Sequence, residues 1–108
     1  MSRLELLHQY AEQEPDNPFN WYALATEYRK YSLVEALPYY EKVWQEFPDY
    51  APNYYHLAHA YWELQEIEKA RQVFEQGLQV LSTQKETKML QELQNAYHNF
   101  LLENDLLE

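Results

Sequence analysis

Apolar residues recur along this chain at the spacing of amphipathic helices. Trp21, Leu24, Ala25 and Tyr28 follow an i, i+3, i+4, i+7 pattern, and comparable patterns run through the rest of the 108 residues. The sequence has a single glycine, whereas a sheet-rich fold with tight hairpins would need many more glycines and Asn-Gly turns. The pattern predicts an all-α protein of six helices, at residues 2–14, 18–30, 33–47, 51–64, 67–81 and 84–104.

Helix-start signals support several of these boundaries. Asn17 followed by Pro18 is typical of an N-cap with proline in the first helical position. The segments 32–35 and 83–86 have the Ser/Thr-x-x-Glu spacing of a capping box, which places helix starts after Ser32 and Thr83. Pro38 falls inside the third predicted helix, where it removes one backbone hydrogen bond. We expect the helix to continue past it on an exposed face; a break at Pro38 is the alternative.

The helical pattern also repeats itself. Trp21, Leu24, Ala25 and Tyr28 recur farther along the chain, with the same spacing, as Tyr54, Leu57, Ala58 and Tyr61. Ala36 and Tyr40 recur at nearly the same offset as Ala70 and Phe74. This self-similarity predicts a helix-hairpin unit of about 34 residues that is stacked on its neighbours.

At these positions the sequence resembles the tetratricopeptide repeat family, whose pattern is W-x2-L-G-x2-Y, then A-x3-F, then P. The first repeat reads Trp21-x2-Leu24-Ala25-x2-Tyr28, Ala36-x3-Tyr40 and Pro48; in the second, Ser82 replaces the closing proline. The resemblance implies a short right-handed solenoid forming a single domain over residues 1–108. Its expected parts are a half-repeat helix at 1–15, repeats at 18–50 and 51–83, and a closing helix at 84–104.

Small residues in the repeat should allow close helix packing. Ala25, Ala36, Ala58 and Ala70 alternate with bulky aromatic residues, so neighbouring helices can approach while the large side chains interdigitate. Gly77 is the only glycine, and in mid-helix it costs about 1 kcal/mol relative to alanine. We expect it to make room for the long last helix.

The resemblance implies a concave groove that receives an extended peptide or a partner helix. Its candidate residues lie beside the packing positions of the first helix of each hairpin and of the closing helix. They are Phe19, Tyr22, Thr26, Arg29, Tyr55, His59, Trp62, Glu63, Gln91, Asn95 and His98, with Asn99 on the same stripe. Aromatic side chains with one polar edge suit a partly wet interface. The alternative is that Tyr22, Tyr55 and Trp62 simply enlarge the core.

One known subtype of the family holds the C-terminal carboxylate of chaperone tails with basic and amide side chains. The corresponding positions here carry Tyr22, Thr26, His56, Lys88 and Glu92. Only Lys88 fits that pattern and Glu92 opposes it, so the residues argue against chaperone tails as the partner.

Charge narrows the classes of partner. Eight Lys and Arg against 18 Asp and Glu give a formal net charge of −10, without any cluster of basic residues. We therefore expect neither nucleic acids nor anionic membrane surfaces as partners, and proteins with basic and apolar residues are favoured. No apolar stretch is long enough to span a membrane, and residues 1–8 do not resemble a signal peptide, so we expect a cytoplasmic protein.

The residues give little support to catalysis or cofactor binding. Cysteine is absent, which excludes disulfides and thiolate metal sites, and there is no glycine-rich phosphate loop. Ser32 and Ser82 are explained by predicted helix starts, so no nucleophile stands in a motif context. We expect neither an enzyme nor a cofactor. His56, His59 and Glu63, which can share one helix flank, with His98 on the last helix as a further ligand, offer a zinc site as an alternative.

The leucines near the end of the chain motivate a second functional hypothesis. Leu101, Leu102, Leu106 and Leu107 cannot all face one helix seam. The chain could therefore be a self-associating structural module that stacks through its terminal helices. We expect a monomer or a weak homodimer.

Overall fold

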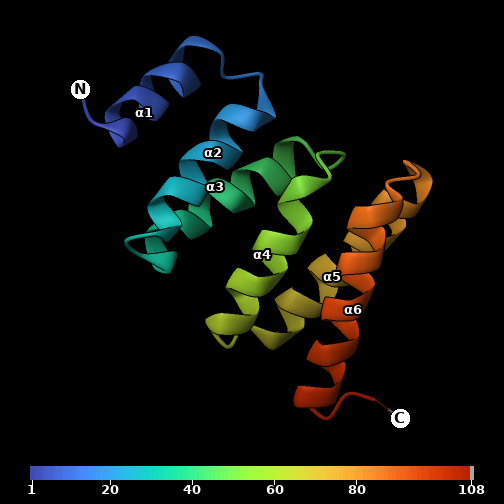
Figure 1. Cartoon of the computed structure of the whole chain (residues 1–108). Helices are drawn as coiled ribbons and strands as arrows, with labels where there is room; N and C mark the ends of the chain where they lie inside the picture. The colour runs from blue at the N-terminus through green and yellow to red at the C-terminus, as the bar shows by residue number, and fades with distance from the viewer. Residues whose placement is uncertain (108) are drawn as a thin grey trace. The chain divides into compact units, whose positions relative to one another are not determined.

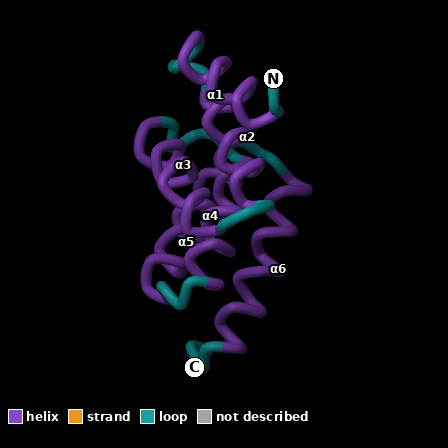
Figure 2. Tube along the Cα trace, turned by 90° about the vertical axis from the view of Figure 1, so that its left-hand side faces the viewer, coloured by secondary structure: helices purple, strands orange, loops and turns teal. Residues whose placement is uncertain are grey.

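A computed structural model describes residues 1–107 and shows six α-helices joined by short loops (Figures 1 and 2). The described part of the chain contains no strand. This confirms the all-α class that the periodicity predicted. The helices are α1 (Arg3–Gln13), α2 (Pro18–Arg29), α3 (Leu33–Glu46), α4 (Pro52–Glu63), α5 (Ile67–Thr83) and α6 (Thr87–Glu103).

The first three helices begin at polar side chains that cap free backbone N–H groups. The Ser2 Oγ accepts from the Glu5 N–H at 3.1 Å, and Asn17 Oδ1 accepts from the Phe19 N–H at 3.1 Å. Ser32 Oγ accepts from the Glu35 N–H at 3.3 Å, as the capping-box spacing predicted. Helix α3 continues without a break past Pro38, which is exposed.

The capping box predicted at 83–86 is wrong. Thr83 is the last residue of α5, and its hydroxyl donates to the Gln79 carbonyl at 3.0 Å. Lys85 then takes a left-handed conformation (φ 60°), and α6 begins only at Thr87. The Glu86 N–H donates to the Leu81 carbonyl at 3.1 Å, which closes the end of α5 by a backbone cap instead.

The chain forms two compact units: Met1–Asn53, and a second that begins at Tyr54. In the first, α2 and α3 form a hairpin and α1 packs on α2. A ladder of rings joins the helices: Tyr39 of α3 stacks on Tyr28 (5.2 Å between centroids) and Trp21 (6.3 Å) of α2. The His8 Nε2 of α1 lies 2.8 Å from the Tyr28 hydroxyl.

Polar contacts hold α1 to α2 within the first unit. The carboxylate of Glu27, which is only 5% exposed, pairs with Arg3 of α1 and with Lys30, each at 3.0 Å. Asn20 donates to the carbonyls of Tyr10 and Glu14 at the end of α1. Because these groups are satisfied, burying them costs little.

In the second unit α4, α5 and α6 pack around Phe74 of α5, which is fully buried. Its ring lies 5.1 Å from Phe100 of α6 and 6.4 Å from Trp62 of α4. A β-carbon at Gly77 of α5 would come within 2.8 Å of both Tyr54 Cβ and Leu93 Cδ2. Gly77 therefore makes the room for α6 that the sequence predicted, and for Tyr54 of α4 as well.

Candidate functional site

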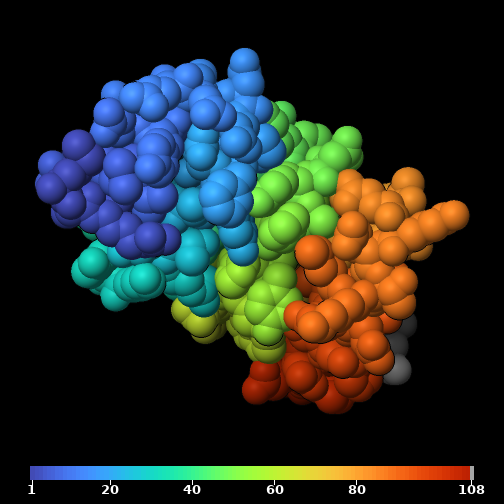
Figure 3. Space-filling view, turned by 45° about the horizontal axis from the view of Figure 1, so that its top comes forward, coloured from blue at the N-terminus to red at the C-terminus, as the bar shows by residue number. Residues whose placement is uncertain are grey.

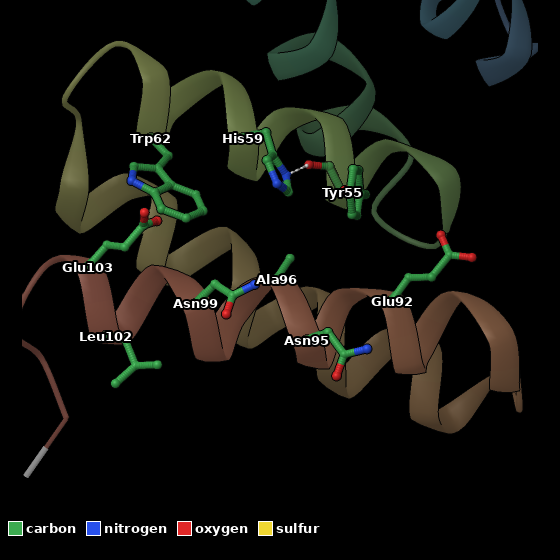
Figure 4. A pocket seen from close by; sticks show the side chains of 9 residues that line it. All are labelled: Tyr55, His59, Trp62, Glu92, Asn95, Ala96, Asn99, Leu102 and Glu103. Atoms are coloured by element: carbon green, nitrogen blue, oxygen red, sulfur yellow. Dashed lines mark hydrogen bonds between the residues drawn. The ribbon is translucent and has the colours of Figure 1, made fainter.

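A pocket of about 630 Å³ lies between α4 and α6, wholly within the second unit (Figure 4). In the space-filling view, α4 (green) and α6 (orange to red) meet at the surface of this unit (Figure 3). Helix α4 supplies an aromatic wall and α6 supplies a mostly polar one. The two helices run past the pocket in the same direction, so that Tyr55 lies near Glu92 and Trp62 lies near Glu103. The lining residues are Tyr55, His59, Trp62, Glu92, Asn95, Ala96, Asn99, Leu102 and Glu103.

The aromatic wall is a row of three rings, and the ring at one end of the row packs against the core. Tyr55, His59 and Trp62 are spaced i, i+4, i+7, so helical geometry places them on one face. The Tyr55 and His59 rings stack at 4.2 Å, and His59 lies 5.7 Å from Trp62. Trp62 packs edge-on against Phe100 at 5.2 Å, whereas Tyr55 is 40% exposed. Trp62 is thus partly core, and Tyr55 faces the pocket.

A hydrogen bond fixes the orientation of the His59 ring. The Nδ1 atom lies 2.8 Å from the Tyr55 carbonyl, one helical turn earlier (Figure 4). A carbonyl oxygen can only accept, so Nδ1 carries the proton and the Nε2 of the neutral ring is left as an acceptor. In addition to ring faces, the wall therefore carries the Tyr55 hydroxyl, the Trp62 indole N–H and the Nε2 acceptor of His59.

The α6 wall places two carboxylates at opposite ends of two amides. Glu92, Asn95, Asn99 and Glu103 are spaced i, i+3, i+7, i+11 and all are exposed. Within residues 1–107, neither Glu92 nor Glu103 forms a salt bridge. The pocket is accordingly acidic at both ends, aromatic on one side and rich in amide groups on the other.

The structure brings together four of the predicted groove residues of the second unit: Tyr55, His59, Trp62 and Asn95. Glu63, Gln91 and His98 are exposed but do not line this pocket. Glu92, Ala96, Asn99, Leu102 and Glu103 complete the lining and were absent from the predicted set, although Asn99 had been placed on the same stripe. A helical wheel centred on Asn95 and Asn99 places Glu92 nearer the centre than His98. Gln91 and Glu103 lie equally far from that centre, so only the packing of α6 against α4 distinguishes them.

The predicted groove residues of the first unit are packed differently. Tyr22 is half-buried, with its ring 5.5 Å from Tyr50 and 6.4 Å from Tyr40. Burial, reinforced by these two phenols, raises the pKa of Tyr22 above its usual value. Thr26 donates its hydroxyl to the Tyr22 carbonyl at 2.9 Å, and Arg29 is half-buried. Phe19, at 55% exposed, is the most accessible of the four.

The zinc alternative has no geometric support. Among the residues that the structure describes, no three His, Asp or Glu side chains come close enough together to hold a metal ion. Over the same residues, no helix is long and apolar enough to cross a membrane.

Successive helix hairpins with a recurring residue pattern define a helical-repeat protein. Residues 29–95 match the family model described as Tetratricopeptide repeat. Two solved structures of a tetratricopeptide repeat domain protein from Salinibacter ruber are similar to this chain. The chain in the solution structure has 36% sequence identity to this one. The match covers 80% of this chain and 88% of the Salinibacter chain, with a TM-score of 0.74. Its crystal structure is 35% identical, covers 78% and 94%, and has the same TM-score of 0.74.

A protein from Bordetella parapertussis shares the fold over 98% of this chain and 93% of its own, with a TM-score of 0.80 and 22% identity. No curated protein matches the chain. The chain belongs to the tetratricopeptide repeat family, as its motif residues predicted. This fold generally mediates protein–protein interaction, and its members are generally non-enzymatic scaffolds.

Proposed function

We propose that the pocket between α4 and α6 binds a segment of a partner protein that carries basic residues beside apolar ones. The observation that supports this most directly is Tyr55, which is 40% exposed and stacks on His59 above the pocket. An aromatic ring left accessible beside a pocket, with its neighbours already ordered, can bury area against a ligand at little entropic cost.

The charge of the chain supports the basic character of the partner. The formal net charge is −10, and the pocket itself contributes two carboxylates that form no salt bridge among residues 1–107. Such a field speeds the approach of a cationic segment, most strongly at low salt. No reaction is proposed, because the pocket residues give binding contacts and no activated nucleophile.

The first unit's stripe is proposed as a contact surface of its own. Because Tyr22 packs on Tyr40 and Tyr50, we assign the main contact to exposed Phe19, with Thr26 and Arg29 beside it. In the second unit, Glu63, Gln91 and His98 remain proposed contacts outside the pocket lining.

The test is capture of partners from a native lysate, followed by affinity measurement with the protein identified. Tyr55→Ala should lower affinity by at least about tenfold, because interface energy concentrates in buried tyrosine and tryptophan anchors. Tyr31→Ala is the matched control: Tyr31 is 71% exposed and lies in the loop between α2 and α3. Unchanged affinity in Tyr55→Ala would place binding elsewhere, and loss in Phe19→Ala would assign it to the first unit.

A second candidate function is self-association through the end of the chain. Leu102 is 51% exposed and Leu107 is 44% exposed, whereas Leu101 and Leu106 are half-buried. If the chain self-associates through this surface, sedimentation velocity will show a dimer that Leu102→Ser weakens. A monomer at high micromolar concentration rejects this candidate.

A further inference from the structure

The two carboxylates of the pocket are held a fixed distance apart. Glu92 and Glu103 are eleven positions apart on the single helix α6, which rises about 1.5 Å per residue. Their Cα atoms are therefore separated by about 16 Å along the axis, on the same face of the helix. Figure 4 shows Glu103 reaching toward the Trp62 indole, and Glu92 standing at the opposite end on the Tyr55 side.

In the first unit, a lysine side chain lies between a tryptophan ring and a carboxylate. There the ammonium of Lys42 lies 4.8 Å from the centre of the Trp21 ring and 2.7 Å from the Glu46 carboxylate. A tryptophan face and a carboxylate thus hold a cation that the chain itself supplies. In the second unit, Trp62 and Glu103 offer the same two groups, and no salt bridge of the described residues occupies Glu103.

The amides between the carboxylates indicate the conformation of the ligand. Asn95 and Asn99 each present two N–H donors and a carbonyl acceptor toward the pocket. An extended peptide has free backbone N–H and C=O groups to pair with them, whereas a helix has already paired its own.

We propose that this pocket selects an extended segment with two Lys or Arg residues separated by four or six positions, so that both side chains leave the backbone on the same side. One cation lies between Trp62 and Glu103, and the other lies at Glu92 beside Tyr55. The separation follows from about 3.3 Å per residue of extended chain across about 16 Å. This inference rests on the proposed function, since it concerns the same pocket, but it can fail separately.

The test uses fluorescein-labelled peptides of serine and glycine with two lysines and one central leucine, followed by fluorescence anisotropy at low salt. The lysines are placed two, four, six or eleven positions apart. The four-spaced or the six-spaced peptide should bind about fivefold more tightly than the two-spaced and eleven-spaced peptides, as a modest cation–π contact and an exposed ion pair allow. Glu103→Gln should remove that advantage.

Matched variants separate this proposal from the proposed function. Glu68→Gln on α5 changes the net charge equally but lies outside the pocket, so it should leave the spacing preference intact. Glu103→Lys should bind best to a four-spaced or six-spaced peptide in which one lysine is replaced by glutamate.

Four outcomes would count against one or both proposals. Equal affinity for all spacings, with binding lost in Tyr55→Ala, overturns the spacing rule and leaves the peptide site standing. Preference for the eleven-spaced peptide means that the ligand is helical and overturns the extended conformation. Binding that neither Tyr55→Ala nor Glu103→Gln reduces overturns the pocket as the site. No binding of any peptide at millimolar concentration overturns both.

Discussion

The first helices of the two repeats carry matching stripes that end up in different surroundings. Tyr22, Thr26 and Arg29 of α2 correspond, one repeat later, to Tyr55, His59 and Trp62 of α4. In the first unit Tyr50, which follows α3, covers Tyr22. The position that corresponds to Tyr50 in the second repeat holds Gln84, and no ring from there covers Tyr55. One repeat pattern therefore yields a packed tyrosine in one unit and an accessible one in the other.

The largest expected effect concerns positions where the two units should behave alike. Ala25 and Ala58 occupy the same motif position and both are fully buried. Replacing either by leucine should destabilise the protein by about 1–3 kcal/mol, because added methyl groups have no space in a close-packed core. Urea denaturation measures this. If leucine were tolerated at only one of the two positions, the helices would pack less closely around that alanine than around the other.

The difference between the stripes is tested by truncating the two tyrosines. Tyr22→Ala should cost about 2 kcal/mol, since it removes a half-buried ring from the contacts with Tyr40 and Tyr50. Tyr55→Ala should cost less than about 1 kcal/mol, because that ring is 40% exposed and mainly touches His56 and His59. Thermal denaturation of the two variants compares them. Equal losses would mean that Tyr55 belongs to the core.

Gly77 distinguishes the second helices of the two hairpins. Its counterpart in the first repeat is Val43, which is also fully buried and carries a β-carbon where Gly77 has none. Gly77→Ala should destabilise the second unit by about 1 kcal/mol, the overlap with Tyr54 Cβ outweighing the gain in helix propensity. Chemical denaturation with far-ultraviolet circular dichroism gives the value. A more stable variant would show that Tyr54 and Leu93 can move away from α5 without cost.

A substitution in one hairpin turn should have a smaller effect and should stabilise the protein, unlike the substitutions above. Gln65, between α4 and α5, has φ 62°, whereas no residue between α2 and α3 has a positive φ. Gln65→Gly should stabilise the protein by about 0.5–1 kcal/mol, because glycine adopts the left-handed region without steric cost. The matched change Tyr31→Gly should destabilise it. Melting temperatures of both variants provide the measurement; a shift of the same sign in both would contradict the difference in turn conformation.

The smallest of the expected effects is a loss of stability in acid. It should be concentrated in the first unit. Hydrogen bonding to Lys30 and Arg3 lowers the pKa of Glu27, and position 60, its counterpart, is Ala60. Because the pKa is lower in the folded state, the contribution to stability is present above the unfolded-state pKa. It is lost as the pH falls through the folded-state value. Melting temperatures from pH 7 to pH 3 should converge for wild type and Glu27→Gln; a constant gap would contradict this.

The sequence by itself determined the helices, the repeat and the family. Periodicity, caps such as Ser32, and the recurrence of the motif residues act over a few turns of one helix, so local spacing is enough to detect them. It also identified the aromatic side of the pocket, since Tyr55, His59 and Trp62 lie on one face of one helix.

Only the tertiary structure decided which of these side chains remain accessible. The cover that Tyr50 gives Tyr22, the core contacts of Trp62, and the position of Glu92 and Glu103 opposite α4 all depend on how separate helices pack. The late start of α6 likewise depended on the left-handed turn at Lys85, which a threonine–glutamate spacing alone does not reveal. Burial is a property of contacts between distant segments, and a periodic pattern records only which face of a helix a residue occupies.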